Sequence, residues 1–231
     1  MITLYQFEIS PFCDKVRRVL HVKGQPYTIR EVKLSEAGRL RQISPTGKYP
    51  VIDHDGRLIT DSTDIARHLE RAFPAPRLVP ADPAAAALVH VLEDWADESL
   101  YFFEMTMRLM WPENAKRWVP VLLKEEGALF RMIGPRMVPK VVAKQSKAQG
   151  TGRKTQTQII ADIERHADAL VLMLGGRSYL VGDALTLADI SVFVQLFCID
   201  GTPEGKAVID ARAPLRAWMT RIDRETCKRM A

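Results

Sequence analysis

The sequence predicts a small α/β domain followed by a larger all-helical domain. Over residues 1–76, segments with the two-residue period of strands alternate with segments of helical period. Prolines at positions 74, 76, 80 and 83 then crowd one short stretch, which is typical of a linker. Beyond that stretch no convincing strand pattern appears. We therefore expect an α/β domain over 1–76, a linker over 77–83 and a helical domain over 84–231.

The composition is that of a globular protein with an ample core. The 231 residues are 47% apolar and 26% charged. Neither a secretory leader nor an apolar run of about 18 residues, the length of a spanning helix, is visible. The three cysteines, Cys13, Cys198 and Cys227, are too few and too scattered for a disulfide framework or a zinc site. We therefore expect a reducing, cytoplasmic setting and no metal.

Positive charge is concentrated in one segment, residues 131–154. It holds seven basic residues and no Asp or Glu, whereas the whole chain carries +5. Apolar residues between positions 137 and 144 make it weakly amphipathic, which would suit phosphates or anionic lipid headgroups. A solvated basic surface remains the favoured interpretation over membrane contact, and no nucleic-acid partner is expected.

The first elements form a βαβ unit. Residues 2–7 mix β-branched, aromatic and polar residues as strands do, and 27–32 repeat the pattern. Between them, Val16, Val19 and Leu20 lie on one helical face. Ser10 suits the cap of that helix and Pro11 its first position. A helix joining two such strands predicts a parallel pair with a right-handed crossover.

The remaining elements follow from turn and cap signals. A short helix is predicted over 35–43, strands flank the hairpin signal at Asp55-Gly56, and a helix begins at Asp61 or Ser62. The first domain therefore reads βαβαββα. Later helical patterns are predicted over residues 84–111, 154–174, 187–198 and 213–229.

Five motifs, in order along the chain, resemble the glutathione S-transferase family. Strand, Ser-Pro-Phe-Cys and helix resemble the start of its thioredoxin-like domain, and Gly-Lys-Tyr-Pro-Val-Ile at 47–52 resembles its G-K-x-P-x-[LIV] segment with a cis proline. Asp61-Ser62 resembles its acidic–serine pair, while 180–189 and 214–218 resemble patterns of its helical domain. The match is weakest over about 112–155. The resemblance implies the two-domain glutathione S-transferase fold and a homodimer.

The resemblance also implies glutathione as co-substrate, bound by Phe12, Lys48, Tyr49, Pro50, Asp61 and Ser62. The backbone before a cis Tyr49-Pro50 bond would pair with the cysteinyl part, as a peptide adds to a sheet edge. Ser62 would bind the γ-glutamyl carboxylate, Asp61 the ammonium and Lys48 the glycyl carboxylate. The alternatives are an ordinary trans Tyr49-Pro50 bond, Asp61-Ser62 as a helix cap alone, and Lys48 as a solvated loop lysine.

Ser10 is the expected catalytic residue, because a hydroxyl donating to the glutathione sulfur keeps it as the nucleophilic thiolate. Ser10 as a helix cap alone is the alternative. Cys13, three residues on, matches the second position of a C-x-x-C motif and could form a mixed disulfide if its pKa were lowered, although buried cysteines are usually inert. Tyr5 is a less favoured hydroxyl, since its strand position predicts a core-facing side chain.

The resemblance places Tyr101, Met105 and Arg108 in a pocket for a hydrophobic electrophile, within a helix rich in Met and aromatic residues. At least half of those apolar side chains are expected in the core. The predicted activity is transfer of glutathione to that electrophile. A non-catalytic interaction or stress protein of the same fold and a thiol oxidoreductase acting through Cys13 are the alternatives.

Overall fold

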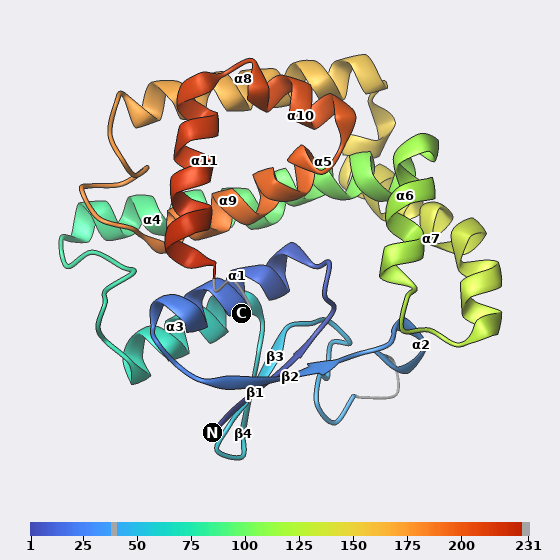
Figure 1. Ribbon diagram of the computed structural model, residues 1–231, viewed down its shortest axis with the longest axis horizontal. Helices are drawn as coiled ribbons and strands as arrows, with labels where there is room; N and C mark the ends of the chain where they lie inside the picture. Colours follow the sequence, from blue (N-terminus) through green and yellow to red (C-terminus); the bar gives the residue numbers. More distant parts are fainter. Residues whose placement is uncertain (38–40, 228–231) are drawn as a thin grey trace.

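The computed structural model describes residues 1–37 and 41–227 and has a β-sheet domain beside a layer of helices (Figure 1). The first domain has the predicted order βαβαββα. Residues 38–40 of the helix predicted over 35–43 lie outside the described part. The elements are β1 (Ile2–Gln6), α1 (Pro11–Val22), β2 (Tyr27–Glu31), α2 (Leu34–Ala37), β3 (Val51–His54), β4 (Arg57–Thr60) and α3 (Ser62–Ala72).

The sheet has the strand order β2-β1-β3-β4. β1 and β2 are parallel, as the βαβ pattern predicts, whereas β3 is antiparallel to both β1 and β4. Tyr5 is opposite Val51, and Val51 is opposite Thr60. The end of β1, the start of β3 and the end of β4 therefore lie side by side, at the edge of the sheet where these strand ends meet.

Two apolar clusters hold the first domain. Ile2 and Leu4 of β1 pack with Val16 of α1 in the main core. Successive strand side chains point to opposite faces, so Tyr5 belongs to a second, smaller cluster around Tyr49. Tyr5 is half-buried on the face opposite the main core, so its predicted core-facing position holds only for the smaller cluster, and Arg30 stacks over its ring.

The helical domain begins with one run that contains two π-helical stretches, η1 and η2. Of the predicted helix over 213–229, residues 228–231 and hence its last two positions lie outside the described part. The elements are α4 (Pro83–Trp95), η1 (Ala96–Leu100), α5 (Tyr101–Met105), η2 (Thr106–Met110), α6 (Pro112–Leu122), α7 (Ala128–Gln149), the 3₁₀ turn η3 (Thr151–Arg153), α8 (Gln156–Leu174), α9 (Leu187–Asp200), α10 (Pro203–Asp210) and α11 (Ala213–Thr226).

α9 runs through the centre of this domain and is buried on nearly every side. Its cap is the carboxylate of Asp189, which accepts hydrogen bonds from the Leu180 N–H at 2.8 Å, the Thr186 N–H at 2.9 Å and the Trp218 indole at 3.2 Å. This capping box ties the preceding loop and α11 to the start of α9. None of the described helices is long and apolar enough to cross a membrane.

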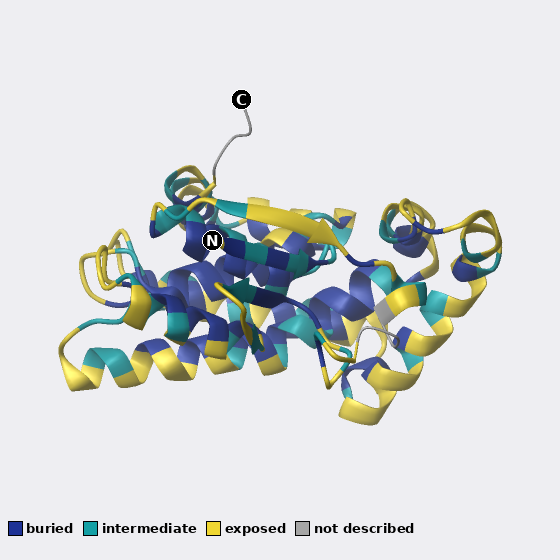
Figure 2. Ribbon diagram, turned by 90° about the horizontal axis from the view of Figure 1, so that it is seen from below, coloured by how far each residue is buried: buried dark blue, intermediate teal, exposed yellow. Residues whose placement is uncertain are grey.

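The two domains share a single apolar core, which runs from β1 through α1 and α9 to α11. Two buried cations of α1 cross the boundary. The Lys15 ammonium bonds to Glu93 and, at 2.7 Å, to Asp97. Arg18 donates to Asp223 at 2.9 Å and to Thr226 at 2.8 Å. Figure 2 shows the dark, buried ribbon continuing from one domain into the other.

Candidate active site

Three predicted segments meet at one edge of the sheet. Ser10 follows β1, Tyr49-Pro50 precedes β3 and Asp61-Ser62 follows β4 (Figure 1). The strand register aligns Tyr5, Val51 and Thr60 side by side, so the chain leaves or enters the sheet there three times. The sheet thereby gathers residues that are up to about fifty positions apart in the sequence.

Ser10 caps α1, as the sequence predicts. Its backbone is extended, with φ −76° and ψ 125°, and Pro11 begins the helix. The hydroxyl oxygen accepts the Cys13 N–H at 3.4 Å, and the Ser10 N–H donates to the Phe7 carbonyl at 3.1 Å. Apart from the Cys13 sulfur, no acceptor among the described residues engages the hydroxyl hydrogen of Ser10. A half-buried O–H donor therefore stands at the positive end of a helix dipole.

The loop before Ser10 is held from the helical domain. The guanidinium of Arg108 donates to the Ile9 carbonyl at 3.1 Å, and the Phe12 ring lies 4.8 Å from that of Tyr101. Arg108 is itself fixed, because it lies 3.4 Å from Glu104 and its guanidinium stacks on Trp118 at 4.6 Å. These contacts position the peptide that carries Ser10.

Cys13 is fully buried beneath the same turn, among Tyr49, Val51 and Val32. Burial raises the pKa of its thiol to about 11, against the smaller opposing effect of the Ser10 hydrogen bond. A thiol in the first turn of a helix can instead have a lowered pKa. The desolvation of Cys13 outweighs the helix dipole, so its thiolate is scarce at neutral pH.

Tyr49-Pro50 is a cis peptide, as the sequence predicts. Tyr49 is buried with its ring 5.4 Å from that of Phe7, edge to face. Its backbone N–H and C=O have no partner among the described residues, since sheet pairing starts at Val51. Lys48 is exposed beside it, and its carbonyl accepts the Ser44 hydroxyl at 2.6 Å.

Asp61, rather than Ser62, caps α3. Its carboxylate accepts the Thr63 N–H at 2.9 Å, and its backbone has φ 71° and ψ 130°. A positive φ is uncommon for a residue with a side chain and clusters at functional sites. Ser62 is the first residue of the helix and is buried, with no partner for its N–H or hydroxyl in the described chain. Two polar groups therefore stay available at a helix N-terminus.

Behind this turn lies a buried ionic cluster of Lys15, Glu93 and Asp97, which the sequence did not predict. Thr63 donates to Glu93 at 2.5 Å, and Glu93 and Asp97 both bind Lys15. Burial alone would lower the pKa of Lys15, but the two carboxylates more than offset this effect, and the pKa is raised. Burial raises the pKa of Asp97 to about 6, and one of its oxygens lacks a partner in the described part. The sequence shows that α1 contains Lys15, but no neighbouring residue indicates that this side chain is buried and paired.

Of the three residues predicted to line the hydrophobic pocket, Tyr101 and Arg108 contact the segment around Ser10. Met105 and Arg108 are each 3% exposed, which leaves them little surface for a second substrate. Their role in a pocket stays a prediction, as does that of Tyr101. A small pocket of about 20 Å³ beside Ile9 is lined by Phe7 and Val32 on one side and by Val121 and Leu122 of α6 on the other, together with the charged residues Glu8, Glu31, Lys33, Lys124, Glu125 and Glu126. The exposed pair Glu8–Lys124, at 2.6 Å, bridges the same two sides.

Comparison with known families agrees with this arrangement. The model of the glutathione S-transferase N-terminal domain matches residues 4–77, and that of the C-terminal domain matches 145–221. The two models match in the order in which the domains occur, and the first contains the whole sheet edge just described. This chain belongs to the glutathione S-transferase family.

Individual relatives are distant from this transferase-family chain. Isoprene-epoxide–glutathione S-transferase of a Rhodococcus species is 24% identical over 97% of this chain and 99% of its own length. Glutathione S-transferase L3 of Arabidopsis thaliana is 27% identical over 55% of each chain, so the match spans about half of that relative. The crystal structure of the β-etherase LigF from Sphingobium sp. strain SYK-6 superimposes with a TM-score of 0.71 at 25% identity, over 96% of this chain and 94% of that one.

Proposed function

We propose that this protein transfers glutathione to a hydrophobic electrophile and that Ser10 stabilises the attacking thiolate. The observation that carries the proposal is the position of the Ser10 hydroxyl. It stands at a helix N-terminus with no oxygen or nitrogen acceptor in the described residues, on the sheet edge shared with Tyr49 and Ser62. Family membership supports glutathione as the co-substrate.

The bound tripeptide would lie along that edge. The free N–H and C=O of Tyr49 pair with its cysteinyl residue, as one strand adds to another. The Ser62 N–H and hydroxyl take the γ-glutamyl carboxylate, Asp61 faces the ammonium, and Lys48 reaches the glycyl carboxylate. Phe12 covers the sulfur side. Bound in this way, the sulfur lies within reach of Ser10.

The chemical step is a nucleophilic substitution or addition. The glutathione thiol releases its proton to solvent, and the Ser10 O–H donates to the resulting thiolate. The sulfur lone pair then forms a carbon–sulfur bond, while the bond to a leaving group or an epoxide C–O bond breaks and takes its electrons. A charge-assisted hydrogen bond contributes on the order of 1.5–3 kcal/mol, or roughly one to two pKa units of the bound thiol.

The second substrate is proposed to be a hydrophobic molecule with an electrophilic carbon. Two similar proteins are named an isoprene-epoxide–glutathione S-transferase and a β-etherase. The pocket next to Ile9, one residue from Ser10, measures about 20 Å³ and is lined by six charged residues besides Phe7, Val121 and Leu122, so it is too small and too polar to be the seat of this substrate.

Ser10→Ala tests the proposal. The pKa of bound glutathione should rise by roughly one to two units, and conjugation of a chlorinated aromatic should fall about tenfold or more at pH 7. Ser10→Thr keeps both the cap and the hydroxyl and should retain activity, which separates a lost donor from a lost helix cap.

Cys13→Ser is the matched control at the same turn. Because Cys13 is buried with a raised pKa, its loss should leave conjugation largely intact. A disulfide mechanism would reverse the ranking and would add the mass of glutathione to Cys13. If Cys13→Ser abolishes activity while Ser10→Ala spares it, or if wild type is not retained on immobilised glutathione, the proposed function is wrong.

A further inference from the structure

The exposed side of α7 combines aliphatic and basic side chains on one stripe. Its members are spaced three or four residues apart, as on one face of a helix. The exposed residues Met137 and Val141 flank it. The α7 stripe consists of Leu129, Met132, Arg136, Lys140, Lys144 and Lys147, all exposed.

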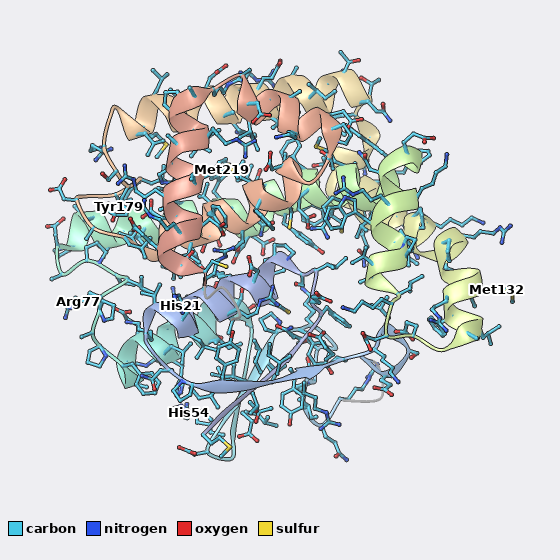
Figure 3. All side chains as sticks on the ribbon, viewed as in Figure 1. His21, His54, Arg77, Met132, Tyr179 and Met219 are labelled. Carbon is cyan, nitrogen blue, oxygen red and sulfur yellow. The ribbon has the colours of Figure 1, made fainter. Side chains whose placement is uncertain are left out.

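The opposite side of α7 fixes the helix to the body of the protein. Gly134 packs so closely on Leu123 that a Cβ there would lie 2.4 Å from its side chain. Val142 is buried, and Ser146 shares a hydrogen bond of 2.5 Å with Thr106. The stripe is therefore a fixed outer surface and does not fold back onto the chain. Figure 2 shows α6 and α7 as a largely exposed lobe, and Met132 lies at its outer edge in Figure 3.

The cations of the stripe are not neutralised by the protein. No ion pair within the described residues involves Arg136, Lys140, Lys144 or Lys147. The acids that flank the segment are engaged elsewhere. Glu126 is buried and accepts the Ser35 hydroxyl at 2.7 Å, and Asp162 pairs with Lys154. The positive field of the stripe is thus directed at solvent.

The exposed aliphatic side chains on and beside the α7 stripe indicate which kind of anionic partner its positive charge attracts. Leu129 and Met132 of the stripe, and Met137 and Val141 beside it, are between 45% and 65% exposed. Such side chains gain nothing from a phosphodiester backbone, where aromatic stacking and polar contacts assist binding. They do gain from insertion between lipid headgroups, where basic neighbours contact phosphates. We propose that the α7 stripe docks this protein on the surface of an anionic lipid bilayer.

In this arrangement Leu129 and Met132 enter the headgroup region while Arg136, Lys140 and Lys144 contact lipid phosphates. Each basic residue close to an anionic membrane strengthens binding about fivefold. The attraction is screened over about 10 Å at 0.1 M salt, so binding weakens as salt rises. The sheet edge that carries Ser10 lies in the other domain, and the proposal is independent of the reaction at that edge.

Co-sedimentation with vesicles tests the proposal. Wild-type protein should pellet with vesicles of mixed phosphatidylcholine and phosphatidylglycerol, but not with phosphatidylcholine alone. The triple variant Lys140→Gln, Lys144→Gln and Lys147→Gln should bind on the order of a hundredfold more weakly. The control triple Lys116→Gln, Lys206→Gln and Arg224→Gln removes as much charge from exposed sites on other helices and should change binding little.

A second pair of measurements separates a membrane from other polyanions. Leu129→Ser with Met132→Ser should weaken vesicle binding several-fold while leaving binding to heparin unchanged. The proposal is overturned if wild type ignores anionic vesicles, or if the control triple loses as much binding as the α7 triple. It is equally overturned if the Leu129→Ser and Met132→Ser pair binds vesicles as wild type does, because the surface would then be a general polyanion site.

Discussion

Ser62 is placed to bind rather than to react. It is buried at the first position of α3, and its N–H and hydroxyl lack partners in the described structure. A group that holds the γ-glutamyl end interacts equally with ground state and transition state. Ser62→Ala should therefore raise the KM for glutathione more than it lowers kcat. Steady-state kinetics with glutathione varied measure both, and a fall in kcat alone would refute the assigned role.

Glu104 gives the fold a pH dependence of its own. Burial raises the pKa of this carboxyl from 4.5 to about 7, although Arg108 opposes the shift. The folded state therefore binds more protons than the unfolded state between about pH 4.5 and pH 7. The contribution of Glu104 to stability is present below that window and is lost as pH rises through it.

Glu104→Gln removes this ionisation. The unfolding free energy of the variant relative to wild type should rise with pH across the window, by on the order of 3 kcal/mol in total. Urea unfolding of both proteins at pH 5 and at about pH 8 measures the difference. The exposed Glu113→Gln on α6 is the control and should track wild type. A constant difference at both pH values would contradict the assignment.

Single residues were predictable where a local pattern marks them. Ser10 as a cap and the turn at Asp61 follow from neighbouring residues, whereas the cis bond before Pro50 was expected only from the family resemblance of residues 47–52. The role of Lys15 was not predictable in this way. Its partners, Glu93 and Asp97, lie about eighty positions away and reach it only after the two domains have packed.

At the scale of elements, the start of α9 depends on one carboxylate. Asp189→Ala would leave the buried donors of Leu180, Thr186 and Trp218 without their acceptor. Unsatisfied buried donors cost about 1–3 kcal/mol each, so we expect a loss of at least about 3 kcal/mol. Urea unfolding measures it. Asp183→Ala, exposed in the same loop, should stay within about 0.5 kcal/mol of wild type, and equal losses would refute the capping account.

The helices α6, α7 and α10 and the short turn η3 were not predicted from the sequence. Pro120 lies within α6, and Pro135 and Pro139 lie within α7, where each removes a backbone donor. Most of α7 faces solvent, so its apolar residues do not repeat as a single buried stripe. By contrast, the helix predicted over 154–174 matches α8 closely, because its buried side chains keep the helical period.

At the scale of the whole molecule, α4 presents Leu88 and Val91 to solvent. We propose that this face is the contact between two copies in a homodimer, because exposed apolar residues on one helix face mark interaction sites. Leu88→Glu with Val91→Glu should convert a dimer into a 26.1 kDa monomer. Sedimentation velocity measures the mass.

Leu172→Glu is the matched control for that experiment. Leu172 is also a large exposed apolar residue, but it lies on α8. The variant should remain dimeric. A wild-type monomer, or dissociation by Leu172→Glu as well, would show that α4 is not the contact.

The shared core and the two cations of α1 limit how this chain can be recombined with its relatives. A chimera cut in the proline-rich linker would join one parent's α1 to the other parent's α4 and α11. Lys15 would then meet foreign residues at positions 93 and 97, in a place closed to water, whereas Arg18 keeps Asp14 of its own helix and meets position 223 at a half-exposed site. A buried cation without its partner costs about 3–5 kcal/mol. A stable exchange of halves therefore requires that the parent supplying α4 carries acidic residues at positions 93 and 97.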